Sequence, residues 1–220
     1  MVEKKVDIAS EKIVNLKNCI RLGEIDQAEI LLKDLIKQNP DSETLLNLEC
    51  VILIQKEKYK EAEEKFSTLI KKKPNFIEAY NNFAHILIIQ NRYDEALNNL
   101  NKAIKIKPDF FKALINKAKI LFNKNEISEL KQFLKQIIDL NPKEIEHFFQ
   151  IWKIYVQINC IFDAKKYYEK AINLSTENNE INNSYGRILL KFNELEKGLK
   201  YIGKSTGFVR FTEKDIKIIS

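Results

Sequence analysis

Residues 77–110 read IEAYNNFAHILIIQNRYDEALNNLNKAIKIKPDF, and these 34 residues contain the clearest structural pattern of the chain. Apolar residues recur in it every three or four positions, as they do along the buried face of a helix. Asn91 stands between two such segments, and Pro108 follows the second. Asn accepts the left-handed backbone conformation that ends many helices, and Pro cannot continue a helix. The stretch therefore predicts two helices joined by a tight turn.

The pattern recurs in both directions, because the chain's four prolines are 34 residues apart, at Pro40, Pro74, Pro108 and Pro142. With each proline at position 32 of a unit, the units are 9–42, 43–76, 77–110, 111–144, 145–178 and 179–212. Position 20 of these units holds Ala28, Ala62, Ala96, Leu130, Ala164 and Gly198. Position 15 holds Gly23, Glu57, Asn91, Asn125, Asn159 and Asn193. All of these except Glu57 are glycine or asparagine, the residues that readily accept a left-handed conformation. Helical hairpins repeated at this period stack into a solenoid, since each buries its apolar face only against its neighbours.

The third unit resembles the tetratricopeptide repeat in Tyr80, Phe83, Ala84, Leu87, Tyr93, Asp94, Glu95, Ala96, Ala103 and Pro108. The resemblance covers about residues 9–206 and implies an all-α fold, a right-handed superhelical solenoid of about six helix-turn-helix repeats. Residues 1–8 then form a lead-in, and residues 207–220 form a C-terminal docking tail or a linker. The family also implies a non-catalytic scaffold that binds proteins or peptides in a concave groove lined by the first helix of each unit.

Charge and cysteine content argue against several other functions. The net charge of +6 is spread over 220 residues, and the one basic run, residues 71–73, ends a predicted helix, where cations offset the macrodipole. We therefore expect no nucleic-acid partner. The three cysteines are odd in number and lack the spacing of a disulfide framework or a zinc site: Cys19, Cys50 and Cys160. This pattern indicates reduced thiols in a cytoplasmic protein.

Membrane insertion and catalysis are not expected either. No stretch approaches the roughly 18 apolar residues that a membrane span needs, so no membrane partner is predicted. The sequence offers no Ser-His-Asp order, no phosphate-binding glycine loop and no paired metal ligands. We therefore expect no catalytic residue, no metal and no cofactor.

The resemblance places several polar side chains in the groove. Position 6 holds Asn82, Asn116 and Gln150 in three successive units. Stacked carboxamides can pair with the backbone of an extended peptide, and residues 79–84 resemble the units of O-linked N-acetylglucosamine transferase whose asparagine ladder holds peptide backbone. The alternative is that these side chains are only solvated. Cations at neighbouring groove positions favour an acidic or C-terminal peptide, and they are His85, Lys112, Lys119, Lys153 and Arg187.

The first two units carry apolar groove positions instead, namely Ile13, Val14, Ile20, Leu48, Val51 and Ile54. Apolar residues open to a groove call for a covering helix from the N-terminal segment, a partner or a second copy of the chain. Trp152 occupies position 8, which normally holds a small residue. We expect its ring to pack in the core and its indole N–H to find an acceptor.

The tail is too apolar for a solvated cap, with Phe208, Phe211, Ile216 and Ile219, so it should dock on the last hairpin or pair two chains. Thr212 and Asp215 predict one short helical turn within it. Similar repeats precede the catalytic domains of modular bacterial sulfotransferases, glycosyltransferases and 2-oxoglutarate oxygenases. The alternative function is therefore substrate recruitment for such an enzyme, with the catalytic domain outside these residues.

Overall fold

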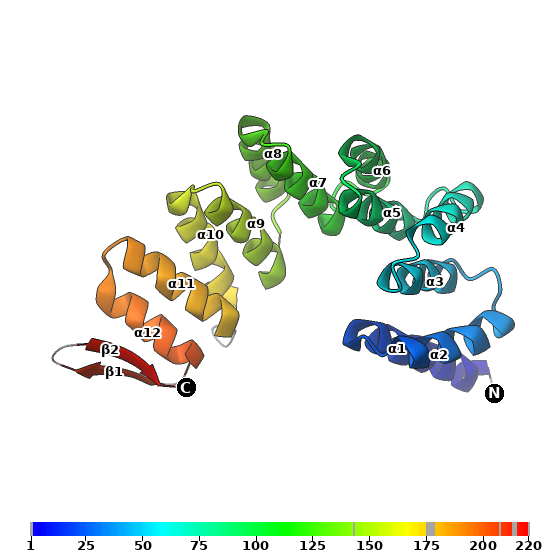
Figure 1. Ribbon diagram of the computed structural model, residues 1–220, viewed down its shortest axis with the longest axis horizontal. Helices are drawn as coiled ribbons and strands as arrows, with labels where there is room; N and C mark the ends of the chain where they lie inside the picture. The colour runs from blue at the N-terminus through cyan, green and yellow to red at the C-terminus, as the bar shows by residue number, and fades with distance from the viewer. Residues whose placement is uncertain (1, 143, 175–178, 207, 213–214, 220) are drawn as a thin grey trace. The chain divides into compact units, whose positions relative to one another are not determined.

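The computed structural model describes residues 2–142, 144–174, 179–206, 208–212 and 215–219. These residues form twelve α-helices followed by two short β-strands (Figure 1). The predicted all-α architecture of helical hairpins is confirmed for the part of the chain before the strands. The chain divides into two compact units, residues 1–117 and 118–220, and α7 (Phe111–Asn123) runs across the division.

The first compact unit contains three complete helical hairpins. Their helices are α1 (Val2–Leu22), α2 (Ile25–Gln38), α3 (Glu43–Gln55), α4 (Tyr59–Lys72), α5 (Ile77–Ile89) and α6 (Tyr93–Ile106). Each odd-numbered helix packs against the helix that follows it, and α2 and α4 also pack against α3 and α5 respectively. Helices α2 and α4 thus contact both their own hairpin and the next one.

The second compact unit continues the same alternation. Its helices after α7 are α8 (Ile127–Asp139), α9 (Ile145–Gln157), α10 (Ile161–Leu174), α11 (Asn179–Lys191) and α12 (Leu195–Thr206). Here α10 packs against both α9 and α11, and α11 packs along α12. The chain then forms β1 (Phe208–Thr212) and β2 (Asp215–Ile219).

The prediction of a helical turn at Thr212 and Asp215 is wrong. The two residues face each other as the last and first residues of β1 and β2, which pair antiparallel along their whole length. Both strands contact α12, beside which they are drawn in Figure 1. The sequence between Phe208 and Ile219 is rich in aromatic and β-branched residues, whose preference for strands outweighs one capping pair.

The turn inside each hairpin has the conformation that position 15 predicts. Gly23 has a φ of +79°, and the non-glycine residues at this position have φ between +57° and +59°, namely Glu57, Asn91, Asn125, Asn159 and Asn193. Glu57 therefore adopts the left-handed conformation without the help of a glycine or asparagine. For an ordinary L-residue this conformation costs about 1–2 kcal/mol.

Each of three second helices ends next to the residue that precedes a proline. Asn39, Lys73 and Lys107 leave the helical conformation, with φ of −141°, −131° and −134°. The ring of the following proline disfavours the helical region for these residues. The 34-residue period of the prolines thus becomes a period of helix ends.

Small residues bring paired helices together. The four alanines at position 20 are fully buried, and α11 approaches α12 through two glycines. A Cβ built on Gly186 would lie 2.6 Å from the backbone oxygen of Gly198, so neither helix could carry a larger residue there without moving. This is the close contact that the pair of small positions predicts.

Trp152 lies in the core, as predicted, but its N–H does not find an acceptor. The ring is 5% exposed, stacks on Phe149 with centroids 5.2 Å apart and meets the edge of Tyr168 at 6.1 Å. Its Nε1 is buried without a hydrogen-bond partner among the described residues, and so is the Tyr168 hydroxyl, whose pKa is raised by burial. These neighbours surround the indole with ring carbons, and no oxygen of the described residues reaches its N–H.

Candidate peptide-binding surface

Four asparagines on three successive first helices form one hydrogen-bonded chain, which we call the carboxamide network. The Nδ2 of Asn116 on α7 donates to Oδ1 of Asn81 on α5 at 3.0 Å. Asn81 Nδ2 donates to Oδ1 of its neighbour Asn82 at 3.2 Å, and Asn82 Nδ2 donates to Oδ1 of Asn47 on α3 at 3.0 Å. Asn47 and Asn81 are buried, whereas Asn82 and Asn116 are half-buried. The network therefore links α3, α5 and α7 and reaches the surface at two side chains.

Two predicted site residues, Asn82 and Asn116, belong to this network, but they do not bond to each other. Both bond to Asn81, which the position-6 pattern misses because it stands at position 5. Each link between helices joins position 6 of one unit to position 5 of the unit before, a separation of 35 residues. An asparagine at each of these positions in consecutive units is the signal that would have revealed the network.

The network leaves part of the hydrogen-bonding capacity of the two half-buried carboxamides unused. A primary amide has two N–H donors and an oxygen with two lone pairs. Among the described residues, Asn82 uses one donor and one lone pair, and Asn116 uses one donor. Each side chain can therefore still donate one hydrogen bond and accept at least one more.

Exposed charges lie on the same helices. His85 follows Asn81 by four residues on α5, and Lys112 precedes Asn116 by four residues on α7, so each of these two side chains shares a helix face with a network member. His85 and Lys112 are exposed, and so is Glu78 near the start of α5. Lys119 is exposed and lies three residues beyond Asn116 on α7.

The remaining predicted site residues lie in the second compact unit and are bound to their own neighbours. Gln150 Nε2 donates to Glu146 Oε1 at 2.5 Å on the same helix, α9. Lys153 Nζ pairs with Glu180 at 2.7 Å and lies 4.1 Å from the centre of the Phe149 ring, and Arg187 Nε donates to Asn183 Oδ1 at 3.0 Å. The hydrogen bond of Gln150 therefore does not extend the carboxamide network.

The apolar positions of the first two units are less open than predicted. Ile20 and Leu48 are only 6% and 7% exposed, because they pack with residues of α1, α2 and α3 in one apolar cluster. Val14 is 54% exposed. Ile20 and Leu48 therefore face the core of these hairpins and need no further covering helix.

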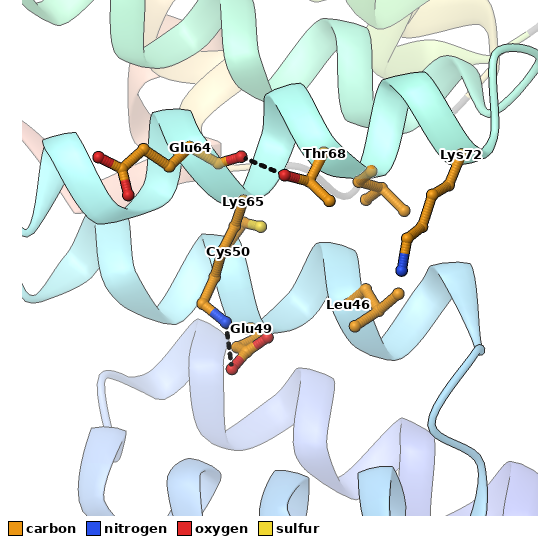
Figure 2. Close-up of a pocket in the computed structure, with 8 residues that line it drawn as sticks. Leu46, Glu49, Cys50, Glu64, Lys65, Thr68 and Lys72 are labelled. Carbon is orange, nitrogen blue, oxygen red and sulfur yellow. Dashed lines mark hydrogen bonds and ion pairs between the residues drawn. The ribbon is translucent and has the colours of Figure 1, made fainter.

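A depression of about 300 Å³ lies between α3 and α4 (Figure 2). Its lining comprises Leu46, Glu49, Cys50, Glu64, Lys65, Thr68, Leu69 and Lys72. Figure 2 shows Lys65 reaching from α4 to Glu49 on α3, an ion pair of 3.0 Å, and the Lys72 side chain extending toward Leu46. The equivalent of Leu46 in the next hairpin is Tyr80, which is 6% exposed. The half-buried leucine fills less of this space than a tyrosine does.

The described cysteines are free thiols. Burial raises the pKa of Cys50 to about 12, so this thiol stays protonated at neutral pH. Within the described residues, no three His, Cys, Asp or Glu side chains cluster closely enough to hold a metal ion. Of the described helices, none combines the length and the apolar character that crossing a membrane requires.

Comparison with known proteins identifies the repeats. Family models match residues 84–125 as a TPR repeat and residues 65–98 and 111–144 as tetratricopeptide repeats. A search of curated protein sequences gave no match.

Solved structures match most of the chain. The thermophilic TPR protein TTC0263 of Thermus thermophilus aligns with a TM-score of 0.69 and 18% identity, over 83% of this chain and 99% of that protein. PilF of Pseudomonas aeruginosa gives 0.65 and 16%, covering 90% of each chain. PilW, a type IV pilus biogenesis factor, gives 0.66 and 18%, over 88% of this chain and 90% of its own. The matched repeats, the hairpin geometry and this shared fold lead to one conclusion: the chain is a tetratricopeptide-repeat protein.

Proposed function

We propose that the chain is a protein-interaction scaffold that holds an extended segment of a partner against the carboxamide network. Repeats of this family generally bind protein partners and are non-catalytic. The observation that carries the proposal is the unused donor and acceptor capacity of Asn82 and Asn116, two half-buried side chains fixed in place by Asn81. Because their partners already orient them, little side-chain entropy is lost when they bind a ligand.

The spacing of the helices suits an extended peptide. Packed helices lie about 8–10 Å apart, and an extended chain rises about 3.3 Å per residue. A peptide that crosses α3, α5 and α7 therefore spans about 16–20 Å, or roughly six residues. Backbone N–H and C=O groups recur along such a peptide whatever its sequence, so the carboxamides supply affinity with little sequence preference.

Charge supplies the preference for an acidic segment. Lys112 stands one helical turn from Asn116, and Lys119 stands nearly one turn beyond it on α7. Lys153 contributes less to this preference than the sequence predicts, because Glu180 already neutralises it. We expect acidic residues of the partner to lie next to α7.

The experiment is a selection of eight-residue peptides on the purified chain, followed by affinity measurements on the best binder. Asn116→Ala should weaken binding about two- to tenfold, which corresponds to one hydrogen bond of about 0.5–1.5 kcal/mol. Lys112→Ala should weaken an acidic peptide further and reduce the dependence of its affinity on salt. Asn99→Ala is the matched control, since within the described part of the chain the side chain of Asn99 on α6 bonds only to the backbone oxygen of Glu95 in its own helix. Equal affinities for the parent and Asn116→Ala would refute the proposal.

A further inference from the structure

Successive hairpins are joined by ion pairs at equivalent places. In each pair, a charged residue at position 21, on the second helix of one hairpin, meets a residue in the connection between the two helices of the next hairpin, at position 14 in the first pair and at position 16 in the other two. Lys56 Nζ lies 2.7 Å from Glu29, Arg92 lies 2.8 Å from Glu63, and Lys165 pairs closely with Glu194. In the last of these pairs the second helix carries the cation, whereas in the other two it carries the acid.

The face of the α1–α2 hairpin that would receive such a second helix is uncovered by the described residues. Helix α1 packs against α2, and α2 packs against α3 on its other side. Leu22 is 64% exposed. Glu24 follows Gly23 in the connection between α1 and α2; it is exposed and pairs with no cation in the described part of the chain. A depression of about 300 Å³ lies on this face, lined by Asn15, Cys19 and Leu31 as well as Leu22 and Glu24.

The occupied counterpart of this face is the α11–α12 hairpin. Adding 170, five repeat periods, to the residue numbers of the α1–α2 depression gives the surface on which α10 packs. Leu22 becomes Phe192, Glu24 becomes Glu194 and Asn15 becomes Tyr185. The same structural positions are thus filled at one hairpin and open at the other.

Three residues of α10, spaced about one helical turn apart, make the contacts at the occupied face. Phe162 is 81% exposed, and its ring meets that of Phe192 in a T-shaped contact with centroids 4.9 Å apart. Lys165 pairs with Glu194 and lies 5.1 Å from the centre of the Phe192 ring. Tyr168 stacks on Tyr185 at 3.8 Å.

We infer that the α1–α2 face binds an amphipathic helix of a partner protein that carries an apolar residue and, three residues later, a lysine or arginine. The apolar residue packs on Leu22 as Phe162 packs on Phe192, and the cation pairs with Glu24 as Lys165 pairs with Glu194. Three residues further on, the helix meets Asn15 instead of a tyrosine ring, so a side chain that can hydrogen-bond fits there best. A helix with an acid at the cation's position, such as α2 or α4, would be repelled by Glu24.

The probe is a capped, fluorescein-labelled helical peptide with the sequence of residues 161–174, added to the full chain and followed by fluorescence anisotropy. The parent chain should bind it, and Glu24→Lys should weaken binding at least tenfold. A peptide carrying Lys165→Glu should fail to bind the parent and should bind the Glu24→Lys chain. Glu11→Lys, an exposed charge reversal on the same helix α1, should leave the affinity within twofold.

Several outcomes would overturn the inference. One is equal binding of the two peptides to both chains, and another is no binding to the parent. Light scattering gives a third: a parent dimer that Glu24→Lys converts to a monomer assigns this face to a second copy of the chain. Unchanged circular dichroism melting of Glu24→Lys would show that any loss of binding comes from the face itself and not from unfolding.

Discussion

Replacing Asn81 by alanine tests whether the carboxamide network holds three hairpins together. Asn81 is 7% exposed, accepts a hydrogen bond from Asn116 and donates one to Asn82. Each bond contributes about 0.5–1.5 kcal/mol, so the substitution should lower the free energy of unfolding by about 1–3 kcal/mol. For a chain of this size, that loss lowers the melting temperature by roughly 2–12 °C.

The assay is urea denaturation followed by circular dichroism at 222 nm. The matched control, Asn99→Ala, removes the same group from a site whose only side-chain bond lies within its own helix, so it should change the free energy by less than about 0.5 kcal/mol. A double-mutant cycle of Asn47→Ala and Asn82→Ala should give a coupling of about 0.5–1.5 kcal/mol for the bond between them. If Asn81→Ala is as stable as the parent, the network contributes nothing and the reasoning fails.

Four further changes test the hairpins. Glu57→Asn should raise the free energy of unfolding by about 0.5–1 kcal/mol, because asparagine tolerates the φ of +58° better than glutamate. Asn125→Glu should lower this free energy by a similar amount. Both are measured as shifts of the urea denaturation midpoint, and a lower midpoint for Glu57→Asn would contradict the strain assigned to Glu57. Leu46→Tyr should stabilise the chain by about 0.5–2 kcal/mol by filling the α3–α4 depression as Tyr80 does in the next hairpin, whereas destabilisation in the same assay would mean that the ring does not fit. Deleting residues 206–220 should lower the melting temperature by several degrees, because β1 and β2 contact α12; an equally stable truncated chain would show that the strands do not support the last hairpin.

The repeat period predicted most of the fold because its signals are local. A left-handed residue at position 15, a small residue at position 20 and a proline at position 32 each act within one hairpin. The structure accordingly gives Asn91 a φ of +59° and buries Ala96 completely. Even Glu57, the one exception in the pattern, follows the geometry that its neighbours impose.

What the sequence could not predict depends on contacts between hairpins or on closely balanced alternatives. The partners of Asn82 are set by the register in which α3 and α5 pack, which no single unit contains. Whether Ile20 faces a groove or a core depends likewise on how closely the neighbouring hairpin approaches. In the tail, the capping pair and the strand-forming residues favour different structures, and only the complete segment decides between them.

The most direct test of the peptide-holding surface observes its side chains. Nuclear magnetic resonance of the ¹⁵N-labelled chain resolves the NH₂ groups of asparagines, and a selected eight-residue peptide can be titrated against them. We expect the NH₂ signals of Asn82 and Asn116 to shift in proportion to bound peptide, because each still has one N–H to donate, while that of Asn99 stays in place. Saturating peptide that leaves the Asn82 and Asn116 signals unmoved, with shifts confined to other helices, would contradict it.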